Sequence, residues 1–271
     1  MIPARTSLWR AGAVAIVLAF FALPIAYLLS VSFKTKDEIL SGDFLPQTWT
    51  LDNWRQAFEA IPLTDFVAHS ISVSLIAGIL TIVITLPAAY AILRLNVAGN
   101  WLVQMVLGSY MAPPVVALIP LFFFLKYAGL LNSLSGLVLV NGLVNVPVAF
   151  WLLTPFLRRI PIEIEQAASL DGARPLRTLV SIITPMIAPG IVATGIIVVI
   201  LSYNEFLLAS TLSMGDASRT LTVGISLFQG DRLVNFGQMA AASLVGILPV
   251  YFVALFMQRH LIEGLAHGGV K

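Results

Sequence analysis

Long apolar blocks alternate with short polar segments along the whole chain. At a rise of about 1.5 Å per residue, a helix needs roughly 17 to 25 mostly apolar residues to cross a bilayer. The blocks that reach this length run from Ala11 to Phe33, Val67 to Leu93, Leu102 to Leu125, Leu134 to Leu157, Ile182 to Leu208, and Met239 to Gln258. The pattern therefore predicts six transmembrane helices.

The composition agrees with a membrane protein. Hydrophobic residues make up 59% of the chain and charged residues 10%, with a mean hydropathy of +0.95, whereas a soluble domain has about 25% charged residues. A water-soluble fold cannot hide so much apolar surface. We expect an all-α polytopic membrane protein with a single transmembrane domain over residues 1–271. Because the chain has no cysteine, disulfides, thiolate metal sites and cysteine nucleophiles are excluded.

The distribution of lysine and arginine predicts the orientation, because cytoplasmic segments carry an excess of both. With the amino terminus inside, the inner segments hold Arg5, Arg10, Arg94, Arg158, Arg159, Arg174, Arg177, Arg259 and Lys271. The outer segments hold Lys34, Lys36, Arg55, Lys126, Arg219 and Arg232. Both termini are therefore expected in the cytoplasm. The first apolar block exceeds the core of a secretory signal, which has about 7 to 15 residues, so we expect a retained span.

One inner connection is much longer than the others and runs over residues 158–181. Pro161 suits the first turn of a helix, and two glutamates follow it near the positive amino end. Gly172 stands where a helix needs a left-handed stop, and a second helix can start near Pro175. The segment therefore predicts a short helix, a glycine turn and another helix.

The first of these helices has a small apolar face, formed by Ile164, Ala167, Ala168 and Leu170. This face is too small to bury a core of its own, and alanines let another protein approach closely. A partner subunit on the cytoplasmic side is therefore one interpretation. The alternative is an amphipathic segment that rests on lipid headgroups.

The same loop resembles a known motif, through Gln166-Ala167-Ala168, Gly172 after three further residues, and Thr184-Pro185. This string is similar to the EAA loop of binding-protein-dependent ATP-binding-cassette importers, whose pattern is Glu-Ala-Ala, three residues, Gly, and a later Leu-Pro. The longer segment from Pro161 to Pro189 resembles the carbohydrate branch of this family, the maltose and glycerol-phosphate type permeases. The resemblance lies in Pro161, Asp171-Gly172-Ala173, Pro185 and Pro189. Weaker similarities include Ser32-Phe33-Lys34 and Asn204-Glu205-Phe206.

The resemblance implies a type I importer permease bundle in the bacterial inner membrane, which moves a sugar into the cytoplasm. The sugar would be a di- or oligosaccharide, or a related polyol or glycerol phosphate. The loop would be a coupling helix seated in a cleft of a separate ATPase subunit. The implied partners are a second permease subunit, two ATPase subunits that bind ATP and Mg²⁺, and an external sugar-binding protein. The chain itself would not be an enzyme.

The resemblance assigns coupling to the ATPase to Glu163, Glu165, Gln166, Ala167, Ala168, Leu170, Asp171, Gly172, Ala173 and Pro185. Gln166 departs from the family pattern, which has glutamate there. A neutral hydrogen bond, or the neighbouring Glu165, would have to replace any ion pair with the ATPase. Since a charged hydrogen bond contributes about 1.5 to 3 kcal/mol and a neutral one about 1, we expect coupling to be adjusted and not lost.

Polar residues in the predicted spans are candidates for the substrate path: Asn141, Asn145, Tyr203, Asn204 and Glu205. Ionisable groups inside a bilayer are often functional, and sugar hydroxyls need hydrogen-bond partners, to which tyrosine adds an apolar face. The favoured alternative is that these groups hold helices together by interhelical hydrogen bonds.

The chain lacks the phosphate-binding loop of an ATPase, because none of its lysines follows a glycine. Its histidines are isolated in the sequence, so no metal site is expected at His69, His260 or His267. The main alternative function is an ion-coupled secondary transporter. Such a transporter needs several acidic residues near the middle of the membrane, and only Glu205 is a candidate.

Overall fold

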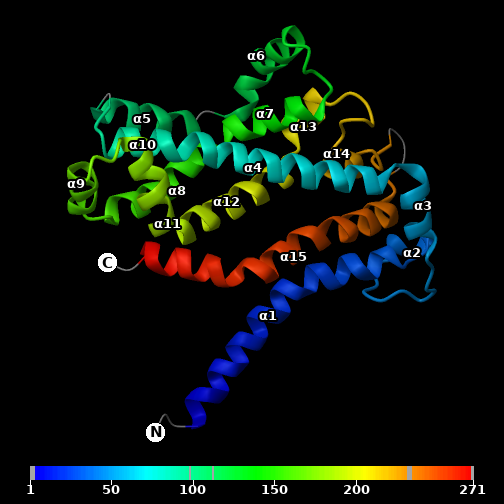
Figure 1. Cartoon of the computed structure of the whole chain (residues 1–271). Helices are drawn as coiled ribbons and strands as arrows, with labels where there is room; N and C mark the ends of the chain where they lie inside the picture. The colour runs from blue at the N-terminus through cyan, green and yellow to red at the C-terminus, as the bar shows by residue number, and fades with distance from the viewer. Residues whose placement is uncertain (1–3, 98, 112, 231–233, 270–271) are drawn as a thin grey trace. The chain divides into compact units, whose positions relative to one another are not determined.

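The computed structural model describes residues 4–97, 99–111, 113–230 and 234–269, and the named elements in these ranges are all helices (Figure 1). They are α1 Ala4–Ser32, α2 Lys36–Ile39, α3 Asp52–Ala60, α4 Leu63–Leu93, α5 Gly99–Tyr110, α6 Pro114–Tyr127, α7 Leu134–Val144, α8 Val146–Arg159, α9 Ile162–Leu170, α10 Pro175–Thr178, the π-helix η1 Leu179–Ile183, α11 Thr184–Met186, α12 Ala188–Tyr203, α13 Leu207–Leu212, α14 Leu221–Ser226 and α15 Phe236–Gly269. The chain divides into two compact units, Met1–Thr64 with Gly224–Leu248 and Asp65–Val223 with Pro249–Lys271.

The predicted spans are found among these helices. Within the described residues, the helices long and apolar enough to cross a membrane alone are Trp9–Ser32, Leu63–Leu93 and Phe236–Leu255. Three bent pairs qualify when each is counted as one span: Trp101–Tyr110 with Pro114–Tyr127, Leu134–Val144 with Val146–Arg159, and Pro175–Met186 with Ala188–Tyr203. Each of these six overlaps one apolar block of the sequence, so the all-α polytopic fold is confirmed.

In the first unit, α1 exposes its apolar side chains. In the most apolar 18 residues of its span Trp9–Ser32, only 11% of the positions are buried inside the protein, and Trp9 and Phe20 are 83% and 72% exposed. A contiguous apolar surface of this kind marks contact with lipid or with another protein. The sequence of α1 thus suits a helix that faces the bilayer.

A buried polar cluster fixes the chain just after α1. The Lys34 side chain is fully buried, its Nζ donates a hydrogen bond to the carbonyl oxygen of Asp43, and the same atom lies 5.5 Å from the centroid of the Tyr27 ring. Asn53 donates from Nδ2 to the carbonyl oxygens of Ser32 and Lys34, at 3.2 and 2.8 Å. These bonds satisfy the buried groups and tie the following loop to the end of α1.

Removing the ammonium of Lys34 is expected to destabilise this cluster. Lys34→Met keeps most of the side-chain volume but removes the charged hydrogen bond to the carbonyl oxygen of Asp43. This loss should lower the free energy of unfolding by about 1.5 to 3 kcal/mol. Lys34→Ala also leaves a cavity and should unfold at a still lower temperature. Thermal unfolding of the purified protein in detergent measures both, with Lys126→Met as the control because Lys126 is exposed. Equal unfolding temperatures for all these proteins would show that the buried ammonium contributes nothing.

The second unit has two apolar clusters. One lies among α4, α6, α7 and α13 and includes Val73, Leu125, Leu137, Val140, Leu208 and Leu212. The other lies among α4, α8 and η1 and includes Leu86, Tyr90, Phe150, Leu153, Leu157 and Ile183. Ile164 of α9 packs against this second cluster, so α9 is attached to the same end of the unit as the last turns of α4 and α8 (Figure 1).

The fifth predicted span is shorter than the sequence suggested. Pro175–Met186 and Ala188–Tyr203 meet at an angle of 83°, and Ile187 between them has the non-helical angles φ −104° and ψ 14°. Pro185 and Pro189 flank this break, and proline has no N–H to continue the hydrogen bonds of a helix. The fifth predicted span is therefore a bent pair, in which α12 is the longer straight part and Pro175–Met186 lies at a steep angle to it.

Candidate coupling site

The predicted helix of the long loop is α9, and proline and glycine delimit it as expected. Pro161 is the N-cap, with φ −58° and ψ 137°, so it stands directly before the first turn. The next helix, α10, begins at Pro175. We call α9, the turn at Gly172 and α10 together the coupling hairpin, residues 162–178.

The end of α9 is a Schellman motif. Gly172 has φ +77°, and its N–H donates to the carbonyl oxygen of Ser169 at 3.0 Å. The N–H of Ala173 donates to the carbonyl oxygen of Ala168 at 2.9 Å. This pair of bonds needs a left-handed residue at position 172, which glycine adopts without steric cost.

The side chains of α9 divide into an outer and an inner face. The outer face is exposed and consists of Glu163, Gln166, Ala167 and Leu170, at the spacing i, i+3, i+4 and i+7 that one side of a helix requires. The inner face consists of Ile164, Glu165 and Ala168. The apolar face expected from the sequence is therefore split, because Ile164 and Ala168 point into the unit whereas Ala167 and Leu170 point out.

Glu165 is held inside the unit by two residues near the end of α4. Its Oε1 lies 2.5 Å from both Nε and Nη2 of Arg94, and its Oε2 accepts a hydrogen bond from the Tyr90 hydroxyl at 3.1 Å. The side chains of the ion pair are only 11% and 10% exposed. Glu165 is consequently paired within this chain, so its carboxylate does not take the place of the motif glutamate at the exposed position of Gln166.

The tip of the coupling hairpin is open. Leu170 is 90% exposed, Asp171 and Gly172 are exposed, and Ala173 is half-buried. No atom lies within 4 Å of the position that a Cβ on Gly172 would occupy. The tip thus presents a leucine and a carboxylate on a surface that nothing in the described chain covers.

The path from the hairpin into the fifth span is a π-helix. The Thr184 hydroxyl donates to the carbonyl oxygen of Leu179 at 2.9 Å, five residues earlier, and Pro185 follows, where it is exposed. A single π turn is costly and is often found at functional sites. The Thr-Pro pair that resembles the end of the family motif therefore sits at the entry to the 83° bend.

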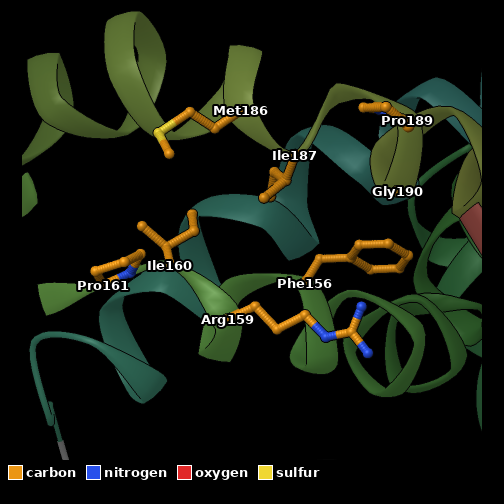
Figure 2. Close-up of a pocket in the computed structure, with 8 residues that line it drawn as sticks. All are labelled: Phe156, Arg159, Ile160, Pro161, Met186, Ile187, Pro189 and Gly190. Carbon is orange, nitrogen blue, oxygen red and sulfur yellow. The ribbon is translucent and has the colours of Figure 1, made fainter. Parts of the chain in front are cut away.

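A cavity of about 360 Å³ lies between the end of α8 and this bend. Figure 2 shows that its lining comes from two segments: Phe156, Arg159, Ile160 and Pro161 on one, and Met186, Ile187, Pro189 and Gly190 on the other. The lining is apolar except for the guanidinium of Arg159. The segment that leads into α9 thus borders open space on the side of the bend, whereas Ile164 and Glu165 pack tightly on the side of α4.

The asparagines proposed for a substrate path are buried in the protein. Asn141 is 2% exposed and donates from Nδ2 to the carbonyl oxygen of Leu137 at 3.0 Å. Asn145 donates from Nδ2 to the carbonyl oxygen of Asn141 at 2.8 Å and to the Ser202 hydroxyl at 3.2 Å. Asn145 thereby joins the bend between α7 and α8 to α12, as the helix-packing alternative expects.

The other three candidates lie together at the end of α12. Tyr203 is buried, and Asn204 is exposed with its Nδ2 bonded to the carbonyl oxygen of Ile200 at 2.8 Å. Glu205 caps the amino end of α13, because its carboxylate accepts the backbone N–H groups of Leu208 and Ala209 at 2.7 and 2.9 Å. Tyr203, Asn204 and Glu205 are consecutive in the chain, and their side chains differ in burial: Tyr203 is buried, Glu205 half-buried and Asn204 exposed.

Sequence reasoning missed the roles of Arg94 and Tyr90. Arg94 was interpreted only as a topology signal, although it directly follows α4, and Tyr90 lies one helical turn before it. Residues four positions apart on a helix share a face, so the pair was visible as a polar patch at the end of an apolar span. Nothing in the sequence indicated that Glu165, 71 positions from Arg94 along the chain, would be its partner.

Known proteins with similar sequences cover nearly the whole chain. Residues 81–267 match the family described as binding-protein-dependent transport system inner membrane component. The sulfoquinovosyl glycerol transport system permease protein SmoH of Agrobacterium fabrum is 36% identical, over 96% of this chain and 92% of that protein. The trehalose transport system permease protein SugB of Mycobacterium tuberculosis is 32% identical over 99% of both chains.

A solved structure has the same fold. One chain in the crystal structure of a bacterial ABC transporter involved in the import of the acidic polysaccharide alginate superimposes with a TM-score of 0.77. The superposition covers 94% of this chain and 95% of that one, at 20% sequence identity. With the helical membrane fold and the extent of the family match, these similarities show that the chain belongs to the inner membrane components of binding-protein-dependent transport systems, the permease subunits of ABC importers, in which partner ATPases hydrolyse the ATP.

Proposed function

We propose that this chain is the permease subunit of an importer for a carbohydrate, a di- or oligosaccharide or a related polyol derivative. The relatives support this substrate class by what they carry: sulfoquinovosyl glycerol in one, trehalose in another, and trehalose or maltose in the 30% identical permease MalG of Thermococcus litoralis. The polar groups Tyr203 and Asn204 at the end of α12 are candidates for contact with sugar hydroxyls.

The proposed assembly contains this chain, a second permease subunit, two ATPase subunits that bind ATP and Mg²⁺, and an external sugar-binding protein. Both termini lie in the cytoplasm in this proposal, in agreement with the excess of lysine and arginine in the inner segments. The coupling hairpin then faces the cytoplasm. It transmits closure of the ATPase pair to the spans.

One observation carries the coupling role, namely the exposed outer face of α9 with Leu170 at its tip. A leucine that is 90% exposed at the end of a short helix bounded by proline and glycine is available for contact with a partner protein. An apolar side chain on one helical face suits a groove in another protein. Gln166 lies on the same face and offers a neutral hydrogen bond where the family pattern has a charge.

Cross-linking tests the contact directly, because the chain has no cysteine of its own. Leu170→Cys in the assembled complex is expected to form a cross-link to the ATPase subunit with a short thiol-to-amine reagent. Leu40→Cys is the matched control, since Leu40 is 82% exposed but lies in the predicted outer loop. A cysteine at position 170 that reacts only with lipid-anchored reagents would refute the contact and favour the lipid-surface alternative.

Transport assays test the energy source and the substrate class. Proteoliposomes with the complete complex are expected to accumulate trehalose, maltose or sulfoquinovosyl glycerol when ATP is supplied, and to continue in the presence of a proton uncoupler. Uptake that stops with the uncoupler and needs no ATP would instead support an ion-coupled secondary transporter. ATP-driven uptake of a non-carbohydrate solute, with no sugar or polyol derivative carried, would contradict the proposed substrate class.

A further inference from the structure

The inner face of α9 is joined to a span that is distant in sequence. The coupling hairpin is connected covalently to α8 before it and to η1 after it. The ion pair of Glu165 with Arg94 adds a third connection, to the end of α4, at an N–O distance of 2.5 Å. Tyr90 strengthens it through a hydrogen bond of 3.1 Å to the second carboxylate oxygen.

This connection is unlike an ordinary surface salt bridge. Exposed pairs are screened by water and salt and hold their partners weakly, as expected for Arg55 and Glu59 on α3, whose side chains are 78% and 60% exposed. In contrast, the side chains of Arg94 and Glu165 are 11% and 10% exposed. Screening is slight at such a site, and loss of one partner leaves a buried charge unpaired.

The geometry also restricts the direction of Glu165. Both carboxylate oxygens are engaged at the end of α4, one by the guanidinium of Arg94, which directly follows the helix, and the other by the Tyr90 hydroxyl. The arginine stands at the carboxyl end of α4, where the partial negative charge of the helix favours a cation. A carboxylate held in this way is directed into its own chain and away from the exposed face of α9.

We propose that Glu165 and Arg94, supported by Tyr90, are positioning residues that clamp the coupling helix to α4, so that a push on the outer face of α9 moves α4 together with α8. Glu165 is then no contact of the ATPase, although it stands next to the motif position Gln166. This inference rests on the proposed function of the hairpin. It divides the hairpin residues into an outer set that contacts the ATPase and an inner set that transmits the movement of α9 to α4.

The ratio of sugar taken up to ATP hydrolysed tests the clamp in proteoliposomes with the complete complex. Glu165→Gln is expected to lower this ratio about tenfold, within the range of typical coupling free energies, while the ATPase subunits still copurify. Tyr90→Phe should lower it less, because the ion pair remains. Glu59→Gln breaks the exposed pair on α3 and should leave the ratio unchanged.

Exchanging the charges of Glu165 and Arg94 distinguishes an ion pair within this chain from a contact between Glu165 and the ATPase. The double variant Glu165→Arg with Arg94→Glu is expected to restore most of the lost ratio, whereas Arg94→Glu alone should be as poor as Glu165→Gln. Loss of ATPase copurification in Glu165→Gln, with no rescue by the exchange, would overturn the proposal, and so would an unchanged ratio in Glu165→Gln. If the complex with Glu165→Gln does not assemble, the double variant Glu165→Arg with Arg94→Glu tests the clamp. Restored sugar uptake in this variant supports the clamp, whereas a complex that assembles without sugar uptake refutes it.

The cross-link from position 170 distinguishes failure of the Glu165–Arg94 clamp from failure of the proposed docking of the coupling hairpin on the ATPase. Leu170→Cys combined with Glu165→Gln is expected to cross-link to the ATPase as well as Leu170→Cys alone does. Absence of the cross-link in both proteins would refute the docking of the hairpin. A cross-link in both with an unchanged ratio would refute only the clamp.

Discussion

Replacing Gly172 by aspartate is expected to abolish sugar uptake while the protein still inserts into the membrane. Gly172 has φ +77°, and no atom lies within 4 Å of its would-be Cβ, so the chain leaves room for a Cβ at this position. The backbone cost of an L-residue in this conformation is about 1 to 2 kcal/mol. The larger effect comes from a second carboxylate beside Asp171 at the tip, because the added side chain and its charge would have to enter the groove of the ATPase. Uptake and an immunoblot of membranes measure the two outcomes.

Gly42→Asp is the matched control for this prediction. Gly42 also has a left-handed backbone, with φ +81°, and also has no atom within 4 Å of a would-be Cβ, but it lies in the predicted outer loop. The two substitutions therefore impose similar backbone strain and the same charge. Full uptake by Gly172→Asp, or an equal loss in Gly42→Asp, would show that the tip of the coupling hairpin has no special role.

The spans and the outline of the hairpin could be predicted from the sequence because both depend on local features. Apolar length alone identified six spans. Proline at the start of α9 has a fixed φ and no N–H to donate, and glycine after its end adopts a positive φ that other residues rarely adopt. Pro161 and Gly172 therefore marked the helix correctly. Such signals need no knowledge of the neighbouring elements.

The two faces of α9 could not be predicted in the same way. Its pattern of apolar residues is too weak to indicate a buried side, since Ala167 and Leu170 are exposed whereas Ala168 is buried. What decides the burial is the position of α4, whose Arg94 attracts the carboxylate of Glu165. The interaction joins residues 71 positions apart, so only the folded chain reveals it.

The role of the polar residue Glu205 also could not be predicted from the sequence. Glu205 attracted attention as an ionisable group near a membrane, yet both of its oxygens accept backbone N–H groups at the start of α13. The carboxylate stands just before the first residue of α13, Leu207, where the positive end of the helix dipole also favours a negative charge. The sequence Glu205-Phe206-Leu207-Leu208 is thus also that of a capped helix start, which was hidden within an apolar block.

Gly136→Ala is expected to produce the largest loss of stability among single methyl additions in the second unit. Gly136 is buried in the first turn of α7, its N–H donates to the Ser133 hydroxyl at 3.1 Å, and a Cβ there would overlap the carbonyl oxygen of Leu130. This obstacle is backbone, which cannot rotate away as a side chain can. Overpacking of this kind costs about 1 to 3 kcal/mol, and we expect the upper end.

Gly195→Ala provides the comparison, because it adds the same methyl group to another span. The single atom within 4 Å of its would-be Cβ is a side-chain carbon of Ile82 at 3.9 Å, which is ordinary contact. Alanine is also the better helix former, by about 1 kcal/mol in water. Thermal unfolding in detergent should therefore show a clear fall for Gly136→Ala and little change for Gly195→Ala. Equal unfolding temperatures would mean that the turn before α7 yields easily, and that the close approach of Leu130 to Gly136 does not fix the start of the fourth span.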